Sequence, residues 1–422
     1  MRIAIAGAGI AGLGTAWLLD PVHDVVVFES QPRVGGRVLT VTTSAGQAVD
    51  VGAQHVAPGA FPLYGRLLEE LGLAPEAVVE VPLSVTVLRG AGSAPALVSP
   101  HGGEAGRGRS TILGDGWAAV RLMVDRATEW RARDTSWEVP LSDLVEPLPV
   151  ARDVKDTLLY PLPAAIFGCD TTRVREMSAR AATDLLAAVP PASPDEAPVW
   201  HGLRAGLGGV PGALADGLVR GRVRTGAGVR LLRRSGDEIE VTDSTGSLHL
   251  VDRVVLATHP DEAARLIAPL PGTGGLVGAL NEFGYTEVLV AAHTDPAYMP
   301  AERRHWSTST VTVHGGWAES STWCGTDGAD VFKSWITHRE EAPRKPLALA
   351  SFRQLCLTPP AVRARTRVAA AQGRGGIHFA GHYLHRVDSQ ESALASAVDV
   401  ARRLAPDGPR LRRLLGRRPA AG

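Results

Sequence analysis

Residues 1–20 read MRIAIAGAGIAGLGTAWLLD and contain the segment that decides the fold. Gly7, Gly9 and Gly12 have the spacing G-x-G-x-x-G, between a strand-like RIAIA and a helix-like LGTAWLL. A second apolar run, DVVVFE, follows and ends on Glu29. A strand, a glycine turn, a helix, a second strand and an acidic residue about 20 positions after the first glycine are the parts of a dinucleotide-binding unit.

Each part of this unit has a physical role. Gly7 permits the tight turn, Gly9 lets the backbone approach a pyrophosphate, and Gly12 lets the helix lie close to the strand. The helix N-terminus offers N–H groups and a positive dipole end to phosphates. Glu29 can accept hydrogen bonds from an adenosine ribose. We therefore expect this segment to bind a nucleotide.

Other interpretations of the N-terminus fit less well. An export signal needs a short apolar helix, which glycines at 7, 9, 12 and 14 would weaken. The apolar run ends at Asp20 and is shorter than the ~20 residues that cross a bilayer. An ordinary glycine-rich corner between strand and helix would require neither the second strand nor its terminal acid.

The bulk composition predicts a soluble globular protein. Of the 422 residues, 45% are apolar and 21% charged, and 44 basic residues balance 44 acidic ones. We expect no attraction to nucleic acid or to an anionic membrane, and no membrane span. Cys169, Cys324 and Cys356 are widely spaced, which predicts no disulfide framework, no metal site and a reducing cytoplasm. The excess of arginine over lysine, with abundant alanine and glycine, indicates a GC-rich bacterial genome.

A second glycine pair indicates a cofactor longer than NAD. Residues 30–40 read SQPRVGGRVLT and residues 49–56 read VDVGAQHV. The order R-x-G-G-R, followed by Asp50 and Gly52, resembles the flavin-containing amine oxidase superfamily. That superfamily includes monoamine and polyamine oxidases, phytoene-desaturase-like enzymes and protoporphyrinogen oxidases. The resemblance implies an α/β fold, with a Rossmann-like FAD-binding domain and an interleaved α+β substrate domain.

Two further segments carry the same resemblance. Residues 376–404, GIHFAGHYLHRVDSQESALASAVDVARRL, are similar to the closing segment of the family, and residues 226–260 resemble its three-stranded middle piece. The final helix would direct its N-terminus at the flavin N1–C2=O edge. Together the resemblances imply that FAD is bound by Gly7, Gly9, Ile10, Ala11, Gly12, Glu29, Ser30, Gly35, Gly36, Arg37, Gly52, Ala53, Gln54, His55, Val229, Gly381, His382, Gln390, Glu391 and Ala393.

The same comparison divides the chain. The first insert shows the 3–4 residue apolar spacing of helices, and the second alternates as strands do. The tail is basic, and we expect it to be solvated. The FAD-binding domain is expected from residues 1–90, 215–275 and 370–405, the substrate domain from 91–214 and 276–369, and the tail from 406–422.

The chain also departs from the family. The strand at residues 283–295, FGYTEVLVAAHTD, lacks the lysine that many members place near flavin N5, and Lys333 lies in a different segment. With Thr286 and Glu287 at that position the locus would be neutral or anionic, which predicts slow reoxidation by O₂. The acid that follows Phe-Ala-Gly in the family is replaced by His382. We interpret Cys356 as an inert thiol and not as an attachment point for flavin.

The catalytic candidates are few. His55 and His385 are the histidines best placed to act as general bases, and Tyr383 is a candidate wall of an aromatic cage, although simple packing would explain each of them. His293 is a further histidine that could face the flavin. The resemblance implies a monomeric or dimeric FAD-dependent oxidoreductase that removes a hydride from a C–H or C–N bond of an organic molecule.

One absence bears on the electron donor. The sequence has no second G-x-G-x-x-G, so we expect the substrate itself to reduce the flavin, and O₂ or another acceptor to reoxidise it. A flavin-dependent isomerase or mutase without net redox, and a non-catalytic FAD-binding scaffold, remain the alternatives. Fold alone does not name the substrate.

Overall fold

The N-terminal unit forms the centre of a parallel sheet. The computed structural model describes residues 1–416 except 58, 74–76, 101–111, 190, 192, 194 and 326–329. In this sheet the apolar first strand is hydrogen-bonded on both sides, so its residues Ile3 to Ala6 are buried. The strand order is β19 (Ile377–Phe379), β13 (Arg253–Leu256), β1 (Arg2–Ala6), β2 (Asp24–Phe28) and β9 (Arg222–Arg224).

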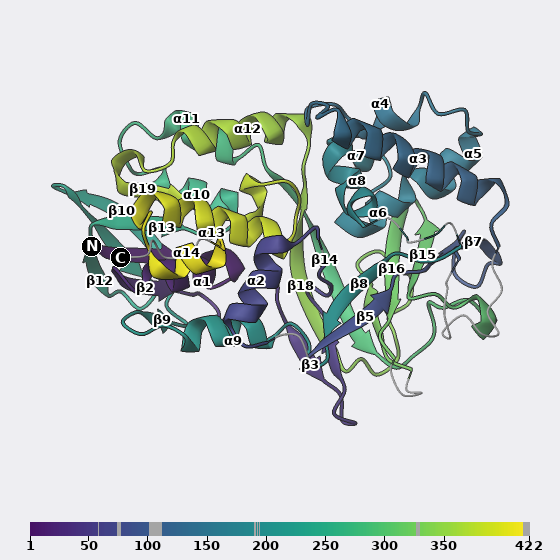
Figure 1. Cartoon of the computed structure of the whole chain (residues 1–422), viewed down its shortest axis with the longest axis horizontal. Helices are drawn as coiled ribbons and strands as arrows, with labels where there is room; N and C mark the ends of the chain where they lie inside the picture. Colours follow the sequence, from purple (N-terminus) through teal and green to yellow (C-terminus); the bar gives the residue numbers. More distant parts are fainter. Residues whose placement is uncertain are drawn as a thin grey trace.

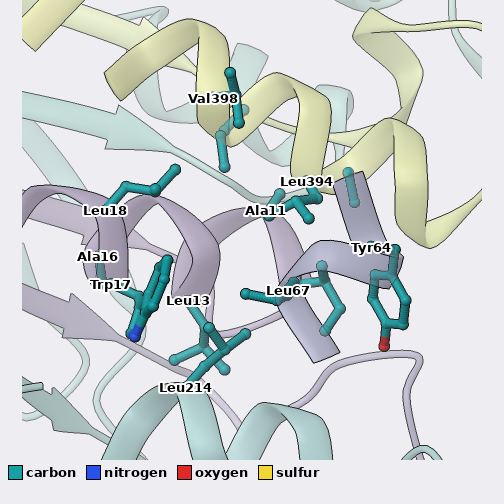
Figure 2. Packing of buried hydrophobic residues seen from close by; sticks show 14 of the residues in the cluster. Ala11, Leu13, Ala16, Trp17, Leu18, Tyr64, Leu67, Leu214, Leu394 and Val398 are labelled. Atoms are coloured by element: carbon teal, nitrogen blue, oxygen red, sulfur yellow. The ribbon is translucent and has the colours of Figure 1, made fainter. Parts of the chain in front are cut away.

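Helix α1 (Ile10–Leu19) is buried along its whole length, as its lack of charged residues predicts. It packs against α13 (Gln390–Leu404), which joins the two ends of the chain in one core (Figure 2). The two helices approach closely at Gly14, where an added Cβ would lie 3.2 Å from Leu394 Cδ1. Helices α2 (Pro62–Glu70) and α9 (Gly209–Asp216) complete this layer.

A three-stranded antiparallel sheet follows β9, as residues 226–260 predict. Strands β10 (Val229–Ser235), β11 (Glu238–Asp243) and β12 (Leu248–Val251) pair in order. Their turns contain Gly236 and Gly246, both at positive φ. The apolar core on this side also includes residues of α10 (Pro260–Ile267), α11 (Gly274–Leu280) and α12 (Pro359–Ala370).

The other half of the molecule is built on a seven-stranded mixed sheet, with helices above it in the view of Figure 1. Strand β6 comes from the first 90 residues and pairs with β15, so this sheet begins before the first insert. In sheet order the strands are β18 (Ala348–Cys356), β14 (Gly284–His293), β17 (Phe332–Trp335), β16 (Trp317–Trp323), β15 (Ser309–His314), β6 (Val85–Leu88) and β7 (Pro95–Val98). The helices are α3 (Gly114–Ala132), α4 (Leu141–Val145), α5 (Arg152–Val154), α6 (Pro161–Phe167), α7 (Arg173–Glu176) and α8 (Ala179–Ala188).

Two short ribbons lie between the halves. Strand β3 (Thr40–Thr42) pairs with β4 (Ala48–Asp50), and β5 (Val78–Pro82) pairs with β8 (Val199–Leu203). Strands β3, β4 and β5 belong to the segment that leads from the glycine turns toward the seven-stranded sheet, whereas β8 belongs to the segment that leads from α8 to α9 (Figure 1).

The prediction that the C-terminal tail is solvated is wrong for the first part of the tail. Residues Pro409–Leu414 form helix α14, in which Leu411 and Leu414 are buried. Arg410 donates hydrogen bonds to the carbonyl oxygens of Trp17 and Gly217, so the helix is fixed to the nucleotide-binding core. Its apolar spacing explains the packing, because Leu411 and Leu414 are three residues apart and share one face. Residues 417–422 lie outside the described part of the chain.

Helices of the described residues offer no membrane span: none combines the length with the apolar character that a bilayer crossing needs.

Candidate functional site

A cavity of about 1490 Å³ connects the two halves of the molecule. It begins at the turn between β1 and α1 and extends to the faces of β15, β16 and β17. Usual pockets for small molecules enclose roughly 300–1,000 Å³. This cavity is therefore large enough for a long cofactor together with a second molecule.

The three glycines of the N-terminal fingerprint face different surroundings. Gly7 has φ +101°, and an added Cβ would lie 2.8 Å from the carbonyl oxygen of Ala257. At Gly12 an added Cβ would overlap the carbonyl of Gly7. Gly9, in contrast, has φ −77° and no atom within 4 Å of an added Cβ, because its Cα faces the cavity. The fold requires Gly7 and Gly12, whereas Gly9 leaves space in the cavity.

Glu29 is fixed at the edge of this nucleotide end. The residue follows β2 and is 8% exposed. Its Oε2 accepts a hydrogen bond from the N–H of Ala8 at 2.8 Å, and its Oε1 accepts one from Gln31 at 2.8 Å. Both bonds orient the carboxylate and leave lone pairs for a ligand.

An ion pair absent from the sequence predictions holds Arg37 on the cavity wall. Arg37 Nη1 lies 2.6 Å from both carboxylate oxygens of Asp388, and Arg37 also donates to Gln354. The N–H of Leu355 donates to the same carboxylate at 3.1 Å. Burial raises the pKa of Asp388, but Arg37 and His382 lower the pKa by more, so the carboxyl group is ionised at neutral pH. Asp388 therefore determines the orientation of Arg37.

Several buried polar atoms on the wall have no hydrogen-bond partner among the described residues. They are both amide atoms of Gln390, the hydroxyl of Tyr383 and Nδ1 of His55. Buried polar groups in proteins are nearly always paired, so such atoms point to a missing ligand or water. Gln390 is the first residue of α13, where helix N–H groups and the helix dipole favour negative charge. This donor set, together with the open space at Gly9, fits FAD.

A lysine lines the cavity, although it does not lie on the strand expected to face the flavin. Strand β17 lies beside β14 and carries Lys333, whose ammonium donates to the Gly52 carbonyl at 2.6 Å and to Gln54 Oε1 at 3.3 Å. Burial lowers the pKa of Lys333 to about 8. Strand β14 itself has no lysine, but the neighbouring strand β17 supplies a cation to the cavity wall. Thr286 is absent from the cavity lining, and Glu287 lines it as an exposed residue of β14.

The candidate general bases differ in position. His55 lines the cavity, and burial together with the nearby Lys333 lowers its pKa to about 3, so it is neutral. His385 is not among the lining residues and bonds Asp399 through Nε2 at 2.9 Å, which corrects its selection as a base. The sequence placed it correctly before α13, but its side chain lies against the outer part of that helix.

Of the two remaining candidate residues, Tyr383 lies at the cavity and His293 lies away from it. Tyr383 lines the cavity and packs edge-on against Phe283, with ring centroids 5.0 Å apart. His293 is on the opposite face of the seven-stranded sheet, where its Nε2 lies 2.8 Å from Ser334 Oγ.

Most of the residues predicted to bind the cofactor line the same cavity. Two of them, Gly12 and Glu391, do not line the cavity. Both oxygens of Glu391 accept N–H groups of the first turn of α2, from Leu63 at 3.0 Å and Tyr64 at 2.8 Å. The helical rotation of about 100° per residue explains why Gln390 faces the cavity and its neighbour does not. The lining residues are Gly7, Gly9, Ile10, Ala11, Glu29, Ser30, Gly35, Gly36, Arg37, Gly52, Ala53, Gln54, His55, Val229, Gly381, His382, Gln390 and Ala393.

His382, which stands where the family has an acid, takes part in the same polar wall. Its Nε2 lies 3.2 Å from the hydroxyl of Tyr285 and 3.6 Å from Asp388 Oδ1. Burial lowers its pKa more than the nearby carboxylate raises it. His382 is therefore neutral at pH 7 and can accept or donate one hydrogen bond at the cavity. Cys356 is buried away from the cavity, in the core formed with the helical insert.

Comparisons with known proteins agree with this geometry. A family model described as flavin containing amine oxidoreductase matches residues 10–352. Zeta-carotene desaturase of Zea mays is 38% identical over 73 residues, which are 17% of this chain and 13% of that protein. Amine oxidase [flavin-containing] B of Sus scrofa is 37% identical over 89 residues, 21% of this chain and 17% of its own length. These matches thus span only a small part of the curated relatives.

A solved structure shows that the likeness in fold covers nearly the whole chain. The CLA-producing fatty acid isomerase from P. acnes aligns with a TM-score of 0.68 over 96% of this chain and 98% of that one, at 14% identity. The two-domain amine oxidase-like fold is therefore shared although the sequences have diverged. With a family model matching most of its length, the chain belongs to the flavin containing amine oxidoreductase family, and its cofactor is FAD.

Proposed function

We propose that the protein is an FAD-dependent oxidoreductase that removes a hydride from a C–H or C–N bond of a small or medium organic molecule, with a C=C or C=N bond in the product. The observation that carries this proposal is the continuous cavity, which joins the glycine turn of β1–α1 to a second compartment between the helices and the seven-stranded sheet. A nucleotide-binding scaffold would need only the first part of that cavity.

We assign the residues along the cavity to parts of the cofactor. Gly9, Glu29 and Val229 would hold the adenosine and pyrophosphate end. Arg37, His382 and Gln390 would bind the middle and the N1–C2=O side of the ring, and Gly52 to His55 would line its other edge. When bound, FAD supplies the hydride acceptor. The protein supplies orientation, exclusion of water and fixed dipoles.

Lys333 is the side chain that we propose for proton handling. With a pKa of about 8 it changes protonation close to neutral pH, whereas the neutral His55 does not. Its ammonium is held by Gly52 and Gln54, on the segment assigned to the flavin ring. A cation at this point would stabilise negative charge that develops nearby during electron transfer. Tyr383 would form part of the wall without a role in proton transfer.

A flavin-dependent isomerase is the second candidate, because the fold neighbour described above is named a fatty acid isomerase. The two functions are separated by mixing the FAD-loaded protein with candidate substrates without oxygen. An oxidoreductase loses flavin absorbance as product forms, while an isomerase forms product with no net loss. FAD binding with neither event would contradict both and leave a scaffold.

The reaction partners are also proposals. We propose O₂ or another small acceptor for reoxidation, because the sequence contains a single G-x-G-x-x-G and thus no second site for a nicotinamide dinucleotide. The three cysteines are free, which supports a reducing compartment such as the cytoplasm.

A further inference from the structure

The sheet wall of the second compartment carries a row of unused hydroxyl groups. Ser309 of β15, with Ser320 and Thr322 of β16, forms a hydroxyl strip that lines the cavity. Ser309 is directly opposite Thr322, and Thr322 is directly opposite Lys333. Opposite residues in a sheet have Cβ atoms about 4.5–5.5 Å apart, so the strip continues to Lys333, whose ammonium is held farther along the wall by Gly52 and Gln54.

These hydroxyls have no internal partner. Among the described residues, no protein group hydrogen-bonds to the side chains of Ser309, Ser320 or Thr322, although each is only partly exposed. The alternate residues Thr310 and Ser321 point to the opposite face and are buried there. The strip is thus available to a molecule in the cavity.

The facing wall is apolar. It is formed by side chains of α3, α6 and α8, with a ridge along α3 at helical spacing. The two charged residues of α3 that line the cavity, Arg121 and Asp125, are exposed at its edge. The principal apolar residues are Trp117, Val120, Val124, Leu162, Ile166 and Leu185.

The charge of this compartment is unsuited to a cation. Among the described residues of β15, β16 and β17, Lys333 is the charged side chain that lines the cavity. The carboxylate of Asp388, which also lines the cavity, is paired with Arg37, and those of Asp125 and Glu287 belong to exposed residues. The nearby buried carboxylate of Asp50 is not in the lining and accepts hydrogen bonds from Thr40 and the N–H of Leu207. An ammonium ion placed beside Lys333 would lose its hydration and meet a like charge, while the buried carboxylate of Asp388 is already paired with Arg37.

We propose that the substrate is a largely apolar molecule with an oxygen function (hydroxyl, carbonyl or carboxylate), and not an amine cation. Its oxygen binds the hydroxyl strip and Lys333, and its apolar body lies against α3, α6 and α8. This substrate class rests on the proposed function, because it assumes that the second compartment receives the molecule to be oxidised.

The test uses three probes that share a ten-carbon chain: decanoate, 1-decanol and decylamine. Each is titrated into the FAD-loaded protein, and binding is read from the change in flavin absorbance. We expect decanoate and 1-decanol to bind at least about tenfold more tightly than decylamine. Thr322→Val and Ser320→Ala should each weaken the two oxygen probes by about three- to tenfold, as expected for the loss of one hydrogen bond.

Thr172→Val is the matched control. Thr172 is exposed at the start of α7, its side chain caps nothing, and it lies outside the lining. It should leave all three affinities unchanged. Tightest binding of decylamine, no spectral change with any probe, or equal affinities in wild type, Thr322→Val and Ser320→Ala would overturn the proposed substrate class. FAD content and anaerobic bleaching of the same samples are read separately, so failure of the oxidoreductase proposal is distinguishable.

Discussion

Replacing Gly9 with valine should weaken FAD binding and leave the fold intact. Gly9 has extended backbone angles, φ −77° and ψ −177°, that any residue adopts. No protein atom lies within 4 Å of the position of an added Cβ. The new side chain would therefore project into the cavity without meeting the protein, and it would occupy the space assigned to the pyrophosphate.

The magnitude follows from steric overlap. Forcing extra methyl groups into a filled site costs about 1–3 kcal/mol. At about 1.4 kcal/mol per factor of ten, the affinity for FAD should fall by about 5- to 150-fold. The stability of the FAD-free protein should change by less than about 0.5 kcal/mol, as for substitutions that disturb no internal contact.

The assay measures FAD binding by fluorescence titration of the FAD-free protein, together with its thermal unfolding. Gly12→Ala is the contrasting variant, because its Cβ would overlap the Gly7 carbonyl and should destabilise the FAD-free fold itself. Wild-type affinity in Gly9→Val would refute the assignment of this turn to the pyrophosphate. Unfolding of FAD-free Gly9→Val would show instead that the glycine is required by the fold.

Three further outcomes are expected. Glu29→Ala should weaken FAD binding by about 10- to 100-fold in the same titration. It should also lower the unfolding temperature of the FAD-free protein, since it leaves the N–H groups of Ala8 and Gln31 without their acceptor. Wild-type FAD affinity in this variant would refute the ribose role. Burial lowers the pKa of Lys333 from 10.5 to about 8. Between these pH values the folded protein therefore binds fewer protons than the unfolded chain. The free energy of unfolding of the FAD-free protein should consequently rise by about 3 kcal/mol as the pH increases from 8 to 10.5. Denaturant unfolding across this range should show no such rise in Lys333→Met, and air reoxidation of the reduced variant should be slower than in wild type; identical pH dependence in the two proteins would contradict the buried ammonium. NADH and NADPH should bleach the flavin slowly in stopped flow, and rapid stoichiometric bleaching would contradict reduction by the substrate itself.

The nucleotide end was predictable because its determinants are local. A glycine spacing, one buried helix and two apolar strands lie within 29 consecutive residues, so the whole pattern can be seen in one stretch of sequence. Gly7 and Gly12 have the roles that their spacing predicts, since the turn and the close approach of helix to strand leave no space for a side chain. The closing helix α13 was predictable for the same reason, with Ser389 as its N-cap.

The first property that the sequence did not predict is the direction in which the side chains of a helix point. Glu391 and Gln390 are neighbours in the sequence, but only one of them can face the cavity, and the pattern of the final helix does not say which. The packing of α13 against α1 and α2 decides the matter, because it turns Glu391 toward the N–H groups of Leu63 and Tyr64. His385 was misjudged similarly, since proximity to the helix start does not fix the side-chain direction.

The second property that the sequence did not predict is the pairing of distant strands, which changes the chemistry of the site. Lys333 is 46 residues beyond Glu287, and no local pattern connects it with the cofactor segment. The antiparallel pairing of β14 with β17 brings it opposite Ala292, and the pleat then directs its ammonium to Gly52. A family position can thus lose its lysine while the neighbouring strand supplies the charge. The pairing of β17 with β16 on its other side sets Thr322 beside Lys333, so the group assigned to proton handling and the strip assigned to substrate oxygen form one surface. A substitution at either residue should therefore affect both the binding of an oxygen function and the pH dependence of its oxidation.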